Sequence, residues 1–272
     1  METWCRQTIC SLAFESLGRF LSSMIRNPVI LGITFFSGTA DEAVERGLSG
    51  GLVVVPSAPV LIELDQSPDQ REALLRSDMA ITDSGLMIMM WRFLKAERIE
   101  RVSGLEYLER MLQIPSLREP GSVAWVMPSP LSRDRNLAWL QASGLKHTAE
   151  DCYLAPMYPK GSIKDPALLS WLESRRPQQV ILALGGGTQE RLGLYLRDRL
   201  NYRPGIHCIG AAIGFLSGDQ VRIPMWADHL FFGWLIRCLS SPSRYVPRYW
   251  KALRLVTMMI RHRDRLPPLR KS

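Results

Sequence analysis

The chain is poor in the residues that build metal centres, disulfide frameworks and membrane spans. Its 272 residues include four histidines and five cysteines, and no two cysteines are spaced as C-x-x-C. An odd number of scattered cysteines is typical of a reducing compartment. No uncharged apolar run approaches the ~20 residues that a spanning helix needs. We therefore expect no bound metal, no cofactor, no transmembrane helix and a cytoplasmic location.

The first segment also lacks the marks of a secretory leader. Its apolar side chains fall on one helical face, but Glu15 and Arg19 interrupt them, and no cleavage site of small residues is evident. We predict an N-terminal amphipathic extension over residues 1–27.

The positive charge of the chain is concentrated in its last segment. The 34 Lys and Arg residues exceed the 26 Asp and Glu residues, giving a formal net charge of +8. Residues 237–272 hold ten of these basic residues and a single acid, Asp264, for a net charge of about +9, so residues 1–236 carry about −1. This asymmetry indicates an anionic partner for the tail: a nucleic acid, an acidic membrane surface or a phosphorylated substrate.

The tail also has the pattern of an amphipathic helix. One face would carry Val246, Tyr249, Leu253, Val256 and Ile260, and basic residues gather on another. Apolar side chains opposite Lys and Arg are typical of a helix lying in the interface of an anionic membrane, which is the interpretation we favour. A helix that packs its apolar stripe on the domain is the alternative. No nucleic-acid partner is expected, because no RNA-binding signature accompanies the charge.

From residue 28 to residue 210, short apolar runs alternate with helical patterns. This predicts an α/β fold, with a Rossmann-like and mostly parallel sheet flanked by helices. Strands are expected at 29–34, 52–55, 79–82, 122–127, 179–184 and 207–210. Helices are expected from Thr39, which can form a capping box with Glu42, and at 70–76, 87–94, 104–112, 133–142, 168–173 and 189–200.

Ligands of such sheets bind beyond the carboxyl ends of the strands. Asp83 ends one predicted strand, and a carboxylate there can act as a general base, although Asp is also an ordinary helix N-cap. Gly185, Gln189 and Glu190 belong to a three-glycine turn that leads from a strand into a helix. Such a turn lets backbone N–H groups approach a phosphate, but it also occurs without any ligand.

Arginines recur through an aromatic-rich segment towards the end of the chain. Arg222, Arg237, Arg244 and Arg248 could bind a diphosphate through their guanidinium groups. Surface arginines on amphipathic helices are the alternative.

Together these pieces resemble the WecG/TagA/CpsF glycosyltransferase family (glycosyltransferase family 26). The resemblance covers roughly residues 28–250, and the last block is its most specific part. It rests on the order and spacing of four blocks: Ser77-Asp78…Asp83-Ser84, Glu100–Glu106, Leu184–Glu190 and Ile209–Tyr249.

The resemblance implies an inverting glycosyltransferase of bacterial cell-surface polysaccharide biosynthesis. Such an enzyme moves a sugar, often N-acetylmannosamine, from a UDP-sugar donor to a polyprenyl-diphosphate-linked sugar acceptor, without a metal. It implies Asp83 as the catalytic base and Arg101 as a ligand of the acceptor's diphosphate, with Gln189 and Glu190 lining the donor pocket. Arg237, Arg244 and Arg248 would neutralise the departing UDP.

The resemblance also implies a domain plan and a location. We expect a glycosyltransferase domain over residues 28–236 and a basic, membrane-associating appendage over residues 237–272, on the inner face of the cell membrane. Formation of a homo-oligomer is left open.

Several positions depart from the family pattern. A site hydroxyl expected after the second strand is Val55, the glycine after the base is Ser84, and family acids are replaced by Gly214 and Gly233. These losses point to altered substrates or to a weakened enzyme. The rival hypothesis is therefore a membrane-docked sugar-nucleotide-binding or scaffold protein of the same pathway.

Overall fold

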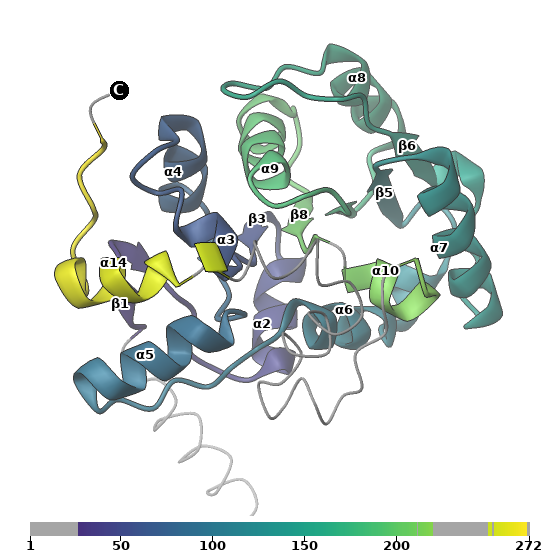
Figure 1. Cartoon of the computed structure of the whole chain (residues 1–272). Helices are drawn as coiled ribbons and strands as arrows, with labels where there is room; N and C mark the ends of the chain where they lie inside the picture. Colours follow the sequence, from purple (N-terminus) through teal and green to yellow (C-terminus); the bar gives the residue numbers. More distant parts are fainter. Residues whose placement is uncertain (1–26, 211, 220–249, 252, 271–272) are drawn as a thin grey trace, which may run out of the picture.

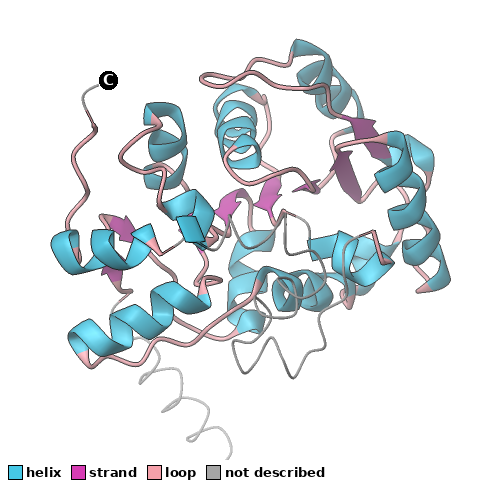
Figure 2. Ribbon diagram, viewed as in Figure 1, coloured by secondary structure: helices cyan, strands magenta, loops and turns pink. Residues whose placement is uncertain are grey.

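The computed structural model describes residues 27–210, 212–219, 250–251 and 253–270 of the chain. Within these residues, six parallel strands form one sheet in the order β4-β3-β8-β7-β5-β6 (Figures 1 and 2). The strands are β3 (Gly51–Val54), β4 (Met79–Ala80), β5 (Val123–Met127), β6 (Cys152–Leu154), β7 (Gln179–Leu182) and β8 (Gly205–Cys208). The predicted α/β class and parallel sheet are confirmed.

Helices cover both faces of this sheet. On one face lie α4 (Pro68–Leu75), α8 (Pro166–Arg175) and α9 (Thr188–Arg199), seen above the sheet in Figure 1. On the other lie α2 (Ala40–Leu48), α6 (Gly104–Leu112), α7 (Pro130–Ala142) and α10 (Ala212–Ser217). Strand residues alternate between the two hydrophobic clusters beneath these layers: Leu52 and Val54 face one, and Val53 faces the other. This alternation follows from the two-residue period of a strand.

Several helix starts are fixed by local sequence. The capping box predicted at α2 is present: the Thr39 N–H donates to Glu42 Oε2 at 2.8 Å, and the Glu42 N–H donates to Thr39 Oγ1 at 3.3 Å.

The predicted helix boundaries are within a few residues of those observed, and α6 matches fully. Strand β6 and the helices α3 (Ala58–Leu61) and α10 lie outside the predicted elements.

One predicted strand is wrong. Residues 29–34 do not form a strand of the main sheet but a small antiparallel hairpin, β1 (Val29–Ile30) and β2 (Ile33–Thr34). The chain turns at Leu31 and Gly32, whose φ angles are 51° and 79°. The turn could not be predicted from the sequence, because it lies within a run of apolar residues and leucine is uncommon at positive φ. The turn also binds the C-terminal segment, since the Leu31 N–H donates to the carbonyl of Arg263 at 2.7 Å.

The described part of the tail forms helix α14 (Arg254–His262), which packs beside α5 (Gly85–Lys95) (Figure 1). Leu255, Met258 and Met259 are buried against the first cluster. The helix is therefore packed on the domain, but by a different stripe from the one expected. Leu253 and Ile260 of the expected stripe are 51% and 53% exposed, whereas Val246 and Tyr249 lie outside the described residues.

None of the helices in the described residues has the length and apolar character needed to cross a bilayer.

Candidate active site

The candidate residues gather at the carboxyl edge of the sheet. Asp83 follows β4, the glycine turn follows β7, and Gly210 follows β8. The first residue of helix α6 lies at the ends of β3 and β8, because a Cβ built on Gly104 would lie 3.2 Å from Val55 Cγ1 and 3.7 Å from the Ile209 carbonyl oxygen. Adjacent strands of a parallel sheet end side by side, so residues distant in sequence meet at this edge.

Asp83 and Arg101 are direct neighbours. The Arg101 Nε–H donates to the Asp83 backbone carbonyl at 2.9 Å, and Arg101 Nη2 lies 3.9 Å from Asp83 Oδ1. Both side chains are partly exposed, at 28% for Asp83 and 18% for Arg101. The sequence-predicted base and diphosphate ligand thus share one partly open position.

The Asp83 carboxylate is held by helix α6 and is not the N-cap of the helix that follows it. Ser84 caps α5 by accepting from the Met87 N–H, whereas Asp83 Oδ1 accepts from the Gly104 N–H at 3.1 Å. The positive end of a helix dipole favours a negative charge at such a place. This fixed, partly exposed carboxylate has the geometry of a general base that is oriented before substrate binds.

Two groups at this site escaped the sequence-based prediction. The backbone N–H of Gly104 orients Asp83, and Thr82 holds the segment that carries Arg101. Thr82 Oγ1 donates to the Glu100 carbonyl at 2.7 Å and accepts from the Val102 N–H at 3.5 Å. A backbone donor leaves no residue-type signal, and a threonine ending an apolar strand is unremarkable.

Gln189 and Glu190 reach the same edge but point inwards, with exposures of 3% and 0%. Gln189 Nε2 donates to the Cys208 carbonyl at 3.1 Å, and Gln189 Oε1 accepts from the Gly210 N–H at 2.7 Å. Glu190 Oε2 accepts from the Gly187 N–H. The pair therefore ties the glycine turn to the end of β8. A direct contact of these side chains with a donor stays a prediction.

Burial has a clear electrostatic effect at this pair. Loss of solvent raises the pKa of Glu190, while hydrogen bonds from Gln189 and from backbone N–H groups oppose the rise. The pKa of the nearby Cys208 thiol is raised too, by burial and then by the Glu190 charge. Cys208 is thus an unreactive core thiol and not a nucleophile.

A side chain would clash with its surroundings at two positions of the glycine turn but not at the third. A Cβ on Gly186 would lie 2.5 Å from Val60 Cγ2, and one on Gly187, whose φ is 88°, would lie 2.7 Å from Gln70 Oε1. A Cβ on Gly185 would meet nothing within 4 Å. Gly185 and Gly186 are both exposed, whereas Gly187 is buried, so a phosphate-bearing ligand can approach the backbone of the turn at its first two glycines.

The remaining predicted ligands, Arg222, Arg237, Arg244 and Arg248, lie outside the described residues. Val55, where the resemblance predicts a hydroxyl-bearing residue, is buried against the first residue of α6. An apolar contact thus stands at this position.

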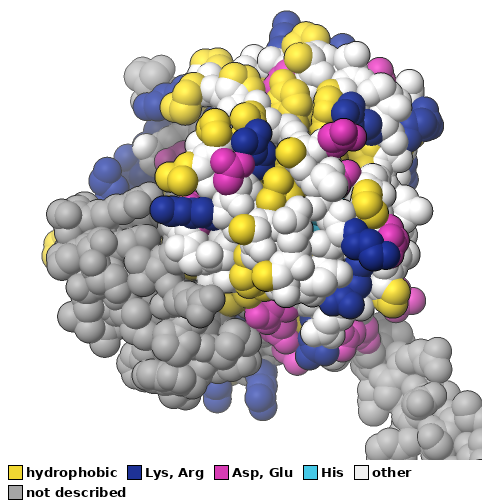
Figure 3. All heavy atoms as spheres, turned by 90° about the vertical axis from the view of Figure 1, so that its right-hand side faces the viewer, with side chains coloured by type: hydrophobic (Ala, Val, Ile, Leu, Met, Phe, Trp, Pro, Cys, Tyr) yellow, Lys and Arg dark blue, Asp and Glu magenta, His cyan; other side chains and the backbone are white. Residues whose placement is uncertain are grey.

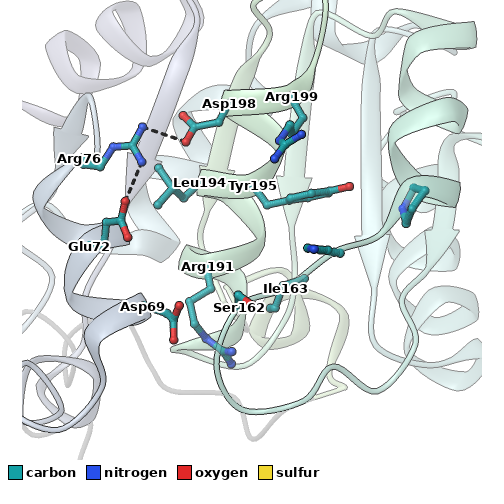
Figure 4. Close-up of a pocket in the computed structure, with 12 residues that line it drawn as sticks. Asp69, Glu72, Arg76, Ser162, Ile163, Arg191, Leu194, Tyr195, Asp198 and Arg199 are labelled. Carbon is teal, nitrogen blue, oxygen red and sulfur yellow. Dashed lines mark hydrogen bonds and ion pairs between the residues drawn. The ribbon is translucent and has the colours of Figure 1, made fainter.

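Two cavities of the described residues are lined by neither Asp83, nor Arg101, nor the glycine turn. One of about 370 Å³ runs between α4, α9 and the 162–166 segment, and Figure 4 shows Arg76 bridging Glu72 and Asp198 on its wall. The other lies at the amino end of β8, around Arg203 and Asp78. No three His, Cys, Asp or Glu side chains in the described part of the chain gather in a way that could hold a metal ion.

Comparison with known proteins agrees with this arrangement. The model of the glycosyl transferase WecG/TagA/CpsF family matches residues 29–268. The chain belongs to this family. A search of curated proteins finds no match. Family membership makes the chain a glycosyltransferase, with a sugar donor and an acceptor as its substrates, and the matched range includes Asp83, the glycine turn and α14.

Proposed function

We propose that the protein is an inverting transferase that moves an N-acetylmannosamine-like sugar from a UDP-sugar to a polyprenyl-diphosphate-linked acceptor. Its place would be the inner face of the cell membrane, in cell-surface polysaccharide biosynthesis. The observation that carries this proposal is the pairing of Asp83 with Arg101 beside the α6 N-terminus, in a chain of this family. A carboxylate and a guanidinium side by side suit a hydroxyl acceptor that carries a diphosphate.

In the proposed reaction Asp83 takes the proton of the acceptor hydroxyl. The hydroxyl oxygen then forms a bond to the anomeric carbon from the face opposite the leaving group. The bond between that carbon and the diphosphate oxygen breaks, and UDP departs with the electron pair. Arg101 binds the acceptor diphosphate, which brings the hydroxyl to Asp83.

Charge on the departing UDP needs a partner in the transition state. We assign this role to Arg237, Arg244 and Arg248, with Arg222 as a further donor ligand. Gly185 offers the backbone approach to the nucleotide diphosphate, and Gln189 with Glu190 maintains the turn that presents it.

The test is Asp83→Asn, assayed as UDP release with a lipid-linked acceptor. Asn keeps an oxygen that can accept from Gly104, so folding should be retained while proton transfer is lost. Turnover should fall about 10²–10⁴-fold, the usual contribution of a general base. Asp134→Asn, at a 62% exposed carboxylate on α7, is the control and should leave turnover unchanged. Undiminished turnover in Asp83→Asn would remove Asp83 as the base.

The second candidate function is a sugar-nucleotide-binding or scaffold protein that has lost turnover. The apolar packing of Val55 where the family has a hydroxyl favours it. Binding of a UDP-sugar by the unmodified protein, without UDP release in the presence of acceptor, would identify this function instead.

A further inference from the structure

Helix α5 exposes large apolar side chains on its outer side. Its inner side is buried through Met87, Ile88 and Trp91, yet Phe93 and Met89 on the outer side are 84% and 59% exposed. A soluble surface helix normally carries polar residues opposite its buried face. Only Arg92 and Lys95 are charged among the eleven residues of α5.

The neighbouring tail segment has the same character. Trp250 is 76% exposed, and Leu253 and Ile260 of the sequence-predicted apolar stripe are about half exposed. Because α14 packs beside α5, two adjacent elements both leave apolar side chains in solvent.

The charge of these two helices is of one sign. Neither α5 nor α14 contains an acidic residue, and Arg92, Lys95 and Arg261 are exposed. The nearest acid after α5, Glu97, accepts a hydrogen bond from Trp91 Nε1 at 3.0 Å. By contrast, Figure 3 shows Lys and Arg intermixed with Asp and Glu on a face turned away from α5 and α14.

From these observations we infer that α5, together with α14, forms a docking surface for an anionic lipid bilayer. Phe93 and Met89 insert among the acyl chains, and Arg92 and Lys95 pair with lipid phosphates. Apolar insertion combined with basic residues is the pattern of interfacial helices. Self-association fits less well, because a two-fold contact through this surface would bring its positive charges together.

This docking gives α5 a role in the proposed reaction, and to that extent the inference rests on the proposed function. Helix α5 begins directly after Asp83 and its cap Ser84. Phe93 lies nine residues beyond Ser84, which is ~13 Å along a helix axis. An inserted α5 would hold the catalytic carboxylate near the bilayer plane, where the diphosphate of a polyprenyl-linked acceptor lies.

The test is sedimentation of the full chain with vesicles of phosphatidylcholine alone or mixed with phosphatidylglycerol. The partition coefficient of the double variant Met89→Ser/Phe93→Ser onto the mixed vesicles should be at least about tenfold lower than that of the unmodified protein. The matched control is Leu131→Ser/Met157→Ser, which changes two other exposed apolar side chains (60% and 97%) and should bind like the unmodified protein. Arg92→Gln/Lys95→Gln should weaken binding to mixed vesicles by about fivefold per charge.

Equal vesicle binding by the Met89/Phe93 variant and the unmodified protein would overturn the inference. So would a loss of self-association in sedimentation velocity with vesicle binding unchanged, which would make the surface a contact between copies. The assay contains neither donor nor acceptor, so it does not depend on turnover. Asp83→Asn should bind vesicles normally while releasing UDP about 10²–10⁴-fold more slowly, which separates failure of docking from failure of the proposed function.

Discussion

At the scale of single residues, His207 shows how a buried polar group is kept neutral in the core. Gln179 Oε1 can only accept, so His207 Nε2 carries the proton and donates to it at 2.8 Å. Nδ1 then accepts from the Tyr107 hydroxyl at 2.9 Å. Complete burial lowers the pKa of His207 to about 3. The ring therefore joins α6, β7 and β8 as a neutral hydrogen-bonding group.

This burial makes the folding stability depend on pH. The folded pKa of about 3 lies below the value of ~6.5 expected in the unfolded chain, so only the unfolded chain binds a proton between them. The contribution of His207 to the free energy of unfolding is fully present above about pH 6.5. It falls by ~1.4 kcal/mol per pH unit as the pH decreases towards about 3. His147, whose pKa is also lowered by burial, acts in the same direction.

Urea unfolding at about pH 7.5 and about pH 5.5 measures the effect. The free energy of unfolding should drop by about 1.4 kcal/mol from His207 alone, and His207→Gln should reduce that drop by the same amount. Identical pH dependence in both proteins would mean that His207 titrates normally.

Gln189 is the second residue whose burial leads to a prediction. Its amide hydrogen-bonds to the Cys208 carbonyl and the Gly210 N–H in a buried place. Gln189→Ala leaves these groups without partners and should lower the free energy of unfolding by ~2–4 kcal/mol, measured by urea denaturation. The control Gln113→Ala, at an exposed position, should change it by less than ~0.5 kcal/mol. A small effect for both would show that water replaces Gln189 at this edge.

At the scale of secondary structure elements, α14 is fixed to the domain by one acidic residue. Asp65, which is 8% exposed, accepts from Arg254 Nη2 at 2.5 Å and from Arg270 Nε at 3.0 Å. The Asp65 carbonyl also accepts from the Arg270 N–H at 2.8 Å. Two of the tail's basic residues, which the charge pattern assigned to an anionic partner, are therefore paired within the protein.

Removal of this partly buried carboxylate should loosen the tail. Asp65→Ala leaves Arg254 without its partner and should lower the free energy of unfolding by about 2–4 kcal/mol, since a buried pair broken on one side is strongly destabilising. Glu72→Ala, which breaks an exposed pair with Arg76, is the control and should cost under ~1 kcal/mol. Hydrogen exchange of the α14 amides should rise in the first variant alone; unchanged exchange would mean that apolar packing suffices.

The elements that the sequence predicts well are those with a strong local signal. The Thr39–Glu42 box of α2 and the apolar period of α6 are both readable from the local sequence. The hairpin at 29–34 and the buried stripe of α14 depend on each other through backbone hydrogen bonds between residues far apart in sequence. No local pattern encodes such a contact. For the same reason Asp83 could be found from its place after a strand, whereas the inward direction of Gln189 could not.

At the scale of the whole molecule, the described part of the basic tail and the near-neutral domain form one folded unit. The buried residues of α14 belong to the same hydrophobic cluster as Leu52, Val54 and Leu182 of the central sheet. The segment around residues 263–264 pairs with the β1–β2 turn. The tail thus both completes the core and, on its other side, contributes apolar and basic groups to the proposed lipid surface.

Because of this double role, we expect truncation of the tail to unfold the domain, so that its effect on membrane binding cannot be measured separately. Deletion of residues 253–272 removes Leu255, Met258 and Met259 from the core, and each buried side chain of this size contributes ~1.5–3 kcal/mol. The summed loss of ~5–9 kcal/mol is comparable to the whole stability of a domain. The truncated chain should be insoluble or lack a cooperative thermal transition by circular dichroism. A chain ending at Arg270 keeps every described contact of α14 and should melt like the full protein. A truncated chain that melts cooperatively at the same temperature would show that the tail is separable from the core. A loss of vesicle binding in that chain could then be assigned to the tail.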